Sequence, residues 1–224
     1  MSRRDTQRAH GGSSGAQTKM IELKHIEKLN IQDGTRVCAG ARQDWYAQKW
    51  RKRAGCGPVT CATLLWYMAQ TCDGLCALCP YNARKREGFL ELMNDVWHYA
   101  TPGRFGLRST AAFVKGIRQY AADRGISLAC DVMDVPTSRR KPQLREAVDF
   151  IADSISRDRP VAFLNLSAGF VAGLQNWHWV PIVGIDPKDF SVRVLDGGDC
   201  VDADFALWLR RTARGGGLVA VAPG

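Results

Sequence analysis

The spacing of apolar residues changes along the chain, from helix-like in the first part to strand-like in the second. In the segment 58–70 (PVTCATLLWYMAQ), a proline suited to the first helical position precedes good helix formers. Ala62, Leu65 and Met68 fall on one face of that helix, which predicts that this face is buried. Similar patterns predict further helices at 86–99, 109–124 and 142–157.

Strand-like segments dominate the second part of the chain. The runs VAFLNL, WHWVPIVGI and FSVRVLD predict strands at 161–166, 177–185 and 190–196. The remaining predicted elements are a strand at 127–133, a short helix near 203–211 and a last strand near 218–222. Helices first and strands afterwards indicate an α+β fold, in which a helical half packs on an antiparallel β-sheet.

The chain divides into a tail and one domain. Residues 1–19 are polar and include the Gly/Ser-rich stretch HGGSSGAQ, so we expect a disordered polar N-terminal tail. From residue 20 to residue 224, no linker-like composition and no repeat interrupts the sequence. Residues 20–224 are therefore predicted to form a single domain.

Composition narrows the class of protein. With 224 residues, of which 46% are hydrophobic, the chain has enough apolar material for a globular core and is neither fibrous nor collagen-like. No stretch approaches the roughly 18 uncharged apolar residues of a membrane helix. The first thirty residues contain no apolar block of the kind that a secretory signal requires. We therefore expect a cytoplasmic protein with no membrane partner.

The charge balance says less about partners. The chain has 31 Lys and Arg against 22 Asp and Glu, a formal net charge of +9. The basic residues are scattered apart from short runs at 49–53 and 139–141, and short charge runs are usually solvated surface. Nucleic-acid binding is not expected. The run that precedes Cys56 hints only at a preference for acidic peptides.

Cys56 stands out among the eight cysteines, which in a reducing cytosol would be buried thiols, metal ligands or nucleophiles. It lies between two glycines and directly before the helix that Pro58 begins. Unpaired N–H groups and the macrodipole at a helix N-terminus favour a thiolate, which is the nucleophilic form. The glycines would let a substrate come close, and the Cys56 amide is placed to donate to an oxyanion. A structural cysteine beside a helix cap is the simpler alternative.

His178 and Asp196 supply the partners that a nucleophilic cysteine needs. His178 opens a predicted strand, and Asp196 ends the next one, 196 − 178 = 18 residues later. A tight turn between two antiparallel strands would bring these side chains together, so that Asp196 holds the imidazole towards Cys56. The alternative for a lone histidine in an apolar strand is a core residue with satisfied hydrogen bonds.

Three segments, GCGPVTCATLLWYM, HWVPIVGID and VRVLDGGD, resemble the papain-like cysteine peptidases. Within that superfamily they are most similar to the bacterial peptidases related to the double-glycine leader peptidases of bacteriocin exporters. The resemblance spans residues 40–222 and implies a papain-like cysteine peptidase fold. It assigns Cys56 as nucleophile, His178 as general base and acid, and Asp196 as the residue that orients the histidine. It further implies a thiol hydrolase that cleaves a peptide or protein substrate through an acyl-enzyme, without a metal or organic cofactor.

The family usually supplies a glutamine shortly before the nucleophile, and the side-chain amide of this glutamine completes the oxyanion hole. Gln48 lies 56 − 48 = 8 residues before Cys56, and Gln43 lies 13 residues before it. Gln48 is closer to the family's spacing and is the preferred candidate. For both glutamines, the alternative is a surface residue with no role in the site.

Cys72, Cys76 and Cys79 form a C-x3-C-x2-C pattern that offers a different chemistry. The pattern resembles the cluster motif of radical S-adenosylmethionine enzymes, but the chain lacks the strand–helix alternation of their barrel. A zinc site would need a fourth ligand. The candidates for it are Cys61, Cys130 and His98. Three loop thiols are the simpler interpretation, so a non-hydrolytic metal-binding or binding protein is an alternative function, and acyl transfer by the same triad is another.

Overall fold

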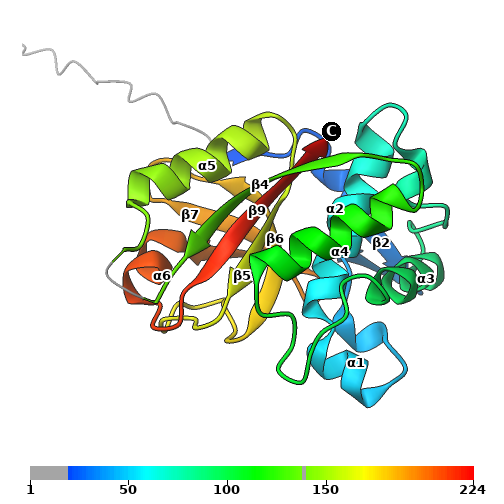
Figure 1. The fold of residues 1–224 in the computed structure, drawn as a ribbon, viewed down its shortest axis with the longest axis horizontal. Helices are drawn as coiled ribbons and strands as arrows, with labels where there is room; N and C mark the ends of the chain where they lie inside the picture. The colour runs from blue at the N-terminus through cyan, green and yellow to red at the C-terminus, as the bar shows by residue number, and fades with distance from the viewer. Residues whose placement is uncertain (1–19, 138–139) are drawn as a thin grey trace, which may run out of the picture.

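The computed structural model describes residues 20–137 and 140–224. In these ranges the chain forms six α-helices and a seven-stranded antiparallel sheet, which confirms the predicted α+β class (Figure 1). None of the described helices has both the length and the apolar character that crossing a membrane requires. The predicted tail at 1–19 lies outside the described residues.

The predicted helices and strands are present, with bounds that differ by a few residues. The helices are α1 (Lys49–Ala54), α2 (Cys56–Thr71), α3 (Arg86–Trp97), α4 (Thr110–Ala122), α5 (Leu144–Ser156) and α6 (Phe205–Arg211). The strands of the main sheet are β1 (Ile21–Glu22), β4 (Leu128–Val135), β5 (Val161–Asn165), β6 (His178–Ile185), β7 (Ser191–Asp196), β8 (Asp199–Asp204) and β9 (Gly216–Pro223). A small second sheet pairs β2 (Asn30–Asp33) with β3 (Arg36–Ala39).

The main sheet runs in the order β4-β9-β5-β6-β7-β8, and β1 pairs with the far end of β6. Every residue of β5 and all but the first of β6 are buried, so helices cover both faces at the centre of the sheet. Both α2 and α5 pack on these two strands. Figure 1 shows α1–α4 gathered on the right of the sheet and α5 on the left. The helical half therefore packs on the sheet as predicted, while α5 covers its other side.

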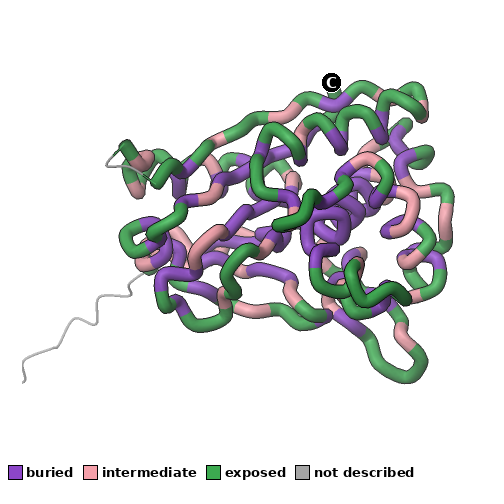
Figure 2. Tube along the Cα trace, turned by 60° about the horizontal axis from the view of Figure 1, so that its bottom comes forward, coloured by how far each residue is buried: buried purple, intermediate pink, exposed green. Residues whose placement is uncertain are grey.

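The helix α2 is buried more completely than the sequence predicts. The apolar spacing predicts one buried face, but every residue from Cys56 to Met68 is buried. The reason is that α2 lies between the sheet on one side and α3 and α4 on the other. Figure 2 shows the buried residues gathered at the centre of the molecule. A helix enclosed on all sides is held firmly, so its first residue, Cys56, has a fixed position.

Two elements that the sequence pattern does not predict are polar. The basic run 49–53 forms most of α1, and four of its five residues are exposed. The edge strand β8 carries three aspartates in six residues, which hides the alternation that marks a strand. Two of these aspartates form ion pairs, Asp199 with Arg36 and Asp202 with Arg193. This edge strand therefore carries ion-paired charges rather than a row of buried apolar side chains.

Candidate active site

Cys56, His178 and Asp196 meet at one end of the central helix. Cys56 is the first residue of α2, His178 the first of β6 and Asp196 the last of β7. Because β6 and β7 are antiparallel neighbours, the start of one lies beside the end of the other. His178 Nε2 is 2.8 Å from Asp196 Oδ1, and the same imidazole interacts with the Cys56 side chain. The structure therefore brings together the three residues that the sequence singles out.

The surroundings of His178 favour its protonated form. The side chains of His178 and Asp196 are 13% and 18% exposed. Burial by itself lowers the pKa of an imidazole, but hydrogen bonds and charge interactions with Asp196 and Cys56 outweigh it and raise the pKa of His178 to about 10. At neutral pH the site therefore holds an imidazolium between a sulfur and a carboxylate. Since Asp196 engages Nε2, Nδ1 is the ring nitrogen that remains for Cys56.

Two loop residues support the triad from the segment before β6. Gln175 Nε2 donates to Asp196 Oδ2 at 3.1 Å, so both carboxylate oxygens accept a hydrogen bond. The main-chain oxygen of Trp177 lies 3.9 Å from Cys56 Sγ, within reach of a weak thiol hydrogen bond. The sequence pattern does not single out Gln175. Its only signal is a polar side chain three residues before His178, and that signal has no meaning until the loop is folded.

The helix that carries Cys56 begins earlier than predicted, at Cys56 itself rather than at Pro58. The amides of Cys56 and Gly57 are thus the first two N–H groups of α2, which lack a partner within that helix. Packing explains the flanking glycines. A Cβ on Gly55 would lie 2.5 Å from a main-chain oxygen of α1, and one on Gly57 would lie 2.8 Å from the Leu107 side chain. Both glycines let neighbouring segments approach the start of α2.

A cavity of about 160 Å³ opens over the triad. It lies between the first two turns of α2, the start of β6 and the segment 41–44. Its polar lining includes Cys56, His178, Asp196, Gln175 and Gln43. A carbonyl group entering this cavity would meet the sulfur, the imidazole and two side-chain amides.

The two candidate oxyanion glutamines differ in position. Gln48, which the family's spacing favours, is exposed, directly precedes α1 and does not line the cavity. Gln43 does line it, although it lies further from Cys56 in the sequence. Gln43 Nε2 donates to the main-chain oxygen of Lys52 at 2.8 Å, and its Oε1 is buried without a hydrogen-bond partner in the described part of the chain. The short helix α1 between Gln43 and Cys56 accounts for the extra sequence separation.

The C-x3-C-x2-C segment lies at the opposite end of α2. Cys72 directly follows α2, Cys76 is exposed, and burial raises the pKa of the Cys79 thiol. Across residues 20–137 and 140–224, no group of three or more His, Cys, Asp or Glu is arranged to hold a metal ion. Cys61, one of the possible fourth ligands, is fully buried in the core, and burial raises the pKa of its thiol.

Comparison with known proteins identifies no family for this chain. A scan against protein-family models finds no match, and a search of curated proteins finds no significant relative.

Proposed function

We propose that this chain is a papain-like cysteine hydrolase that cleaves a peptide or amide bond through an acyl-enzyme on Cys56. The observation that carries the proposal is the contact of His178 with both Cys56 and Asp196. A nucleophile, a base and an orienting carboxylate in mutual contact are the groups that acyl transfer requires. The arrangement of elements supports the same proposal, because the nucleophile begins a central helix and its partners lie on adjacent antiparallel strands.

In the first half of the reaction, the Cys56 thiolate attacks the substrate carbonyl carbon. A C–S bond forms, and the carbonyl π electrons move to the oxygen. The amide of Cys56 and the side-chain amide of Gln43 stabilise this oxyanion. The C–N bond then breaks as His178 gives its proton to the departing amine. A thioester on Cys56 and a neutral imidazole remain.

In the second half, water enters and His178 removes one of its protons. The resulting hydroxide attacks the thioester carbon, and the C–S bond breaks with its electron pair returning to sulfur. The acyl group leaves as a carboxylic acid, and the thiolate and imidazolium are restored. Asp196 stays ionised throughout and keeps the imidazole in line with both sulfur and substrate. These steps balance without a metal or an organic cofactor.

The test uses a small activated ester, since a general thiol acyl acceptor needs no specific peptide. The protein is mixed with p-nitrophenyl acetate and quenched in acid, and mass spectrometry locates the acetyl group. We expect a burst of p-nitrophenol, acetylation of Cys56 and slow regeneration of the free thiol. A Cys76→Ala variant, which removes an exposed thiol at the other end of α2, is the matched control and should behave as the wild type.

Two outcomes would change the assignment. If acetyl groups accumulate on other cysteines but not on Cys56, or if Cys56 reacts equally fast in a His178→Ala variant, the hydrolase proposal is wrong. Glycinamide added as an amine acceptor distinguishes hydrolysis from acyl transfer. Acetylglycinamide formed faster than acetate would assign the same triad to an acyltransferase.

A further inference from the structure

The residue directly before the catalytic histidine is held between two arginines. The guanidinium carbons of Arg108 and Arg214 each lie 4.7 Å from the ring centre of Trp177. At this distance a guanidinium and an indole face attract each other. Arg108 belongs to the segment before α4 and Arg214 to the segment before β9, so two distant parts of the chain converge on one ring.

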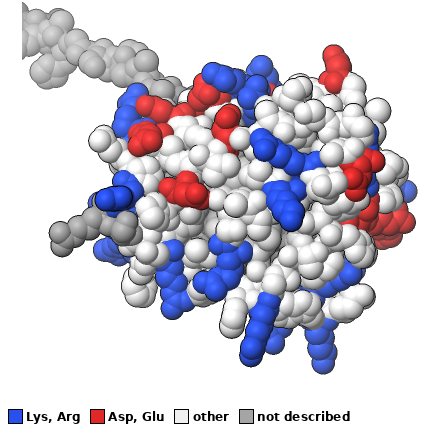
Figure 3. All heavy atoms as spheres, in the orientation of Figure 1, with Lys and Arg blue, Asp and Glu red and all other residues white. Residues whose placement is uncertain are grey.

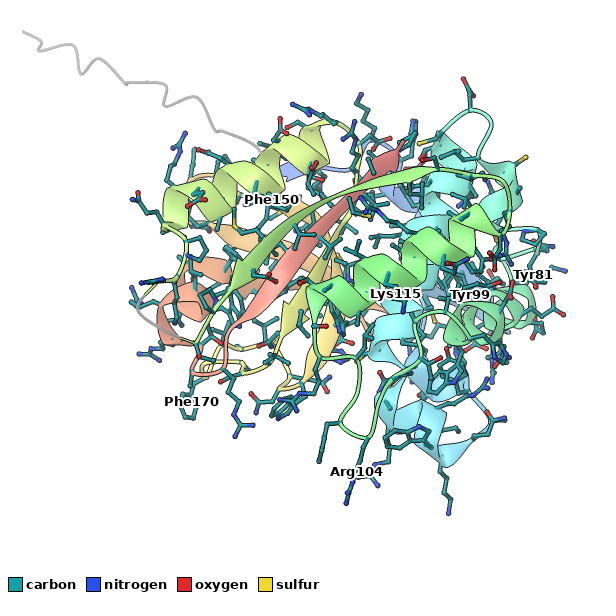
Figure 4. The ribbon with its side chains drawn as sticks, viewed as in Figure 1. Tyr81, Tyr99, Arg104, Lys115, Phe150 and Phe170 are labelled. Atoms are coloured by element: carbon teal, nitrogen blue, oxygen red, sulfur yellow. The ribbon has the colours of Figure 1, made fainter. Side chains whose placement is uncertain are left out.

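A second aromatic ring extends the same surface. Phe105 is 67% exposed, and Arg104 and Arg108 lie 5.6 and 5.9 Å from its ring centre. Figure 4 shows Arg104 projecting from the loop between α3 and α4 at the lower edge of the molecule. Figure 3 shows basic side chains along that edge and acidic ones further up and to the sides. We name Arg104, Phe105, Arg108, Trp177 and Arg214 the arginine–aromatic rim.

The charges of the rim are not neutralised by the described residues. No ion pair within residues 20–137 and 140–224 includes an arginine of the rim. Asp134 is the carboxylate that lines a surface pocket together with Arg108 and Arg214, and it accepts a hydrogen bond from the Thr110 hydroxyl at 2.5 Å. Elsewhere the fold does pair its arginines, as Arg193 bonds with both Glu22 and Asp202.

The rim borders the nucleophile through one residue. The main-chain oxygen of Trp177 lies 3.9 Å from Cys56 Sγ, while its ring lies between the two arginines and the residue is 40% exposed. Trp177 has a φ of +59°, a left-handed conformation that a bulky residue adopts only when its surroundings hold it there. The turn fixes the rim relative to the sulfur, so a substrate bound at Cys56 has one flank beside Trp177.

We propose that the arginine–aromatic rim selects substrates that carry a carboxylate close to the scissile bond. Guanidinium groups bind carboxylates through paired, charge-assisted hydrogen bonds, and the exposed rings offer an apolar surface for the adjoining chain. The carboxylate comes from an Asp or Glu side chain or from the free C-terminus of a peptide. This inference rests on the proposed function, because it takes Cys56 as the nucleophile.

The experiment compares two alkylating reagents of nearly equal size, anionic iodoacetate and neutral iodoacetamide. Their second-order rate constants at Cys56 are measured by mass spectrometry at low salt. The ratio of the iodoacetate rate constant to the iodoacetamide rate constant is then divided by the same ratio for the thiol of 2-mercaptoethanol. We expect the normalised ratio to fall about fivefold in an Arg108→Gln/Arg214→Gln variant, because the loss of two nearby positive charges weakens the Coulomb attraction of the site for an anion. High salt should also lower the wild-type ratio, because salt screens the charges of the rim.

A matched control removes two positive charges at the other end of α2. Arg84 and Lys85 are exposed, and Arg84 lines a pocket with Gln70 near the end of that helix. The Arg84→Gln/Lys85→Gln variant should keep the wild-type ratio. A ratio that is the same in the rim variant as in wild type would overturn the inference, as would an equal fall in the control. Failure of the hydrolase proposal would give a different result. In that case the wild-type Cys56 would react slowly with iodoacetamide, whatever the ratio of the two rate constants.

Peptides identify the source of the carboxylate. We would measure how well three short peptides protect Cys56 from iodoacetamide: one with a glutamate and an amidated end, its glutamine counterpart, and a neutral peptide with a free C-terminus. Better protection by the glutamate peptide assigns the rim to acidic side chains, and better protection by the free carboxylate assigns it to C-termini. If the glutamine peptide protects Cys56 as well as the other two peptides do, carboxylate selection is contradicted. Circular dichroism checks that each variant is folded.

Discussion

The two ends of α2 both carry cysteines, yet their surroundings differ in kind. At the start, Cys56 is buried, contacts an imidazole and lies beside a carboxylate-bound histidine. At the end, Cys72 and Cys76 lie in a more exposed turn, where the Cys72 thiol contacts the hydroxyl of Thr71. Cysteines at the two ends of one helix thus have different chemical surroundings. A thiol becomes a candidate nucleophile through the groups that surround it, and three closely spaced thiols are not sufficient.

The largest expected effect separates these two ends directly. Cys56→Ala should lower the rate of acetyl transfer from p-nitrophenyl acetate by about 10⁴-fold or more, because the covalent step is lost. A Cys72→Ser/Cys76→Ser/Cys79→Ser variant should retain the wild-type rate. Stopped-flow absorbance of p-nitrophenol measures both rates.

The opposite pattern would break the comparison. If the triple variant loses activity while it stays folded, the turn after α2 takes part in function. Elemental analysis of protein purified without oxygen addresses the same point, because stoichiometric zinc or iron that disappears in the triple variant would make that turn a metal site.

The second effect concerns the partner of the nucleophile. His178→Ala should slow alkylation of Cys56 by iodoacetamide at pH 6 by about 100-fold, since general acid–base partners contribute about 10²–10⁴. Asp196→Asn should give a smaller loss, because the amide still holds the ring but carries no charge. Alkylation of exposed Cys76 in the same samples is the internal control and should not change.

The third effect distinguishes two glutamines. Gln43→Ala should reduce acylation by about 10²-fold, the usual cost of losing one oxyanion donor, because Gln43 lines the cavity. Gln48→Ala should have no effect, since Gln48 is exposed outside it. Equal losses in both variants would argue that the segment before Cys56 acts through stability, which thermal unfolding would reveal.

The fourth effect is a pH dependence of stability. The pKa of His178 is raised to about 10 in the folded protein from an ordinary 6.5, so protonated His178 stabilises the fold fully below about pH 6.5. This contribution is lost as the pH rises through 10, and we expect it to amount to at least about 2 kcal/mol of the free energy of unfolding. Urea unfolding from pH 6 to pH 11 should show a steeper alkaline loss for the wild type than for His178→Gln. Parallel curves would mean that His178 is neutral in the fold.

The smallest effect again contrasts the two ends of α2. Gly57→Ala should lower the free energy of unfolding by about 1–3 kcal/mol, because the new Cβ would lie 2.8 Å from Leu107. Gly74 has free space around it but a φ of +77°, so Gly74→Ala should cost only about 1 kcal/mol. Only the first variant should also slow acylation. Chemical denaturation and the ester assay measure the two properties side by side.

The sequence predicts the class of fold and much of the site because its strongest signals are local. Pro58 and the apolar run behind it mark a helix, and the spacing from His178 to Asp196 marks two antiparallel strands. Gln43 and the arginine–aromatic rim depend instead on contacts between distant segments. The helix α1 places Gln43 in the cavity rather than Gln48, and its basic residues resemble a solvated charge run. Likewise, Arg108 and Arg214 are far apart in the sequence and come together only when α4 packs on the sheet and β9 joins it.

The pairing of β1 with the far end of β6 has a practical consequence. Ile21 lies opposite Ile185, whereas His178 is at the other end of the same strand, about 24 Å away along its length. In β9, Gly216 lies at the His178 end, so Pro223 lies at the distant end as well. Surface tethers, fluorophores or fusion partners joined near Ile21 or Pro223 would therefore leave the mouth of the cavity open. Such attachment would suit immobilised assays in which the cavity faces the solution.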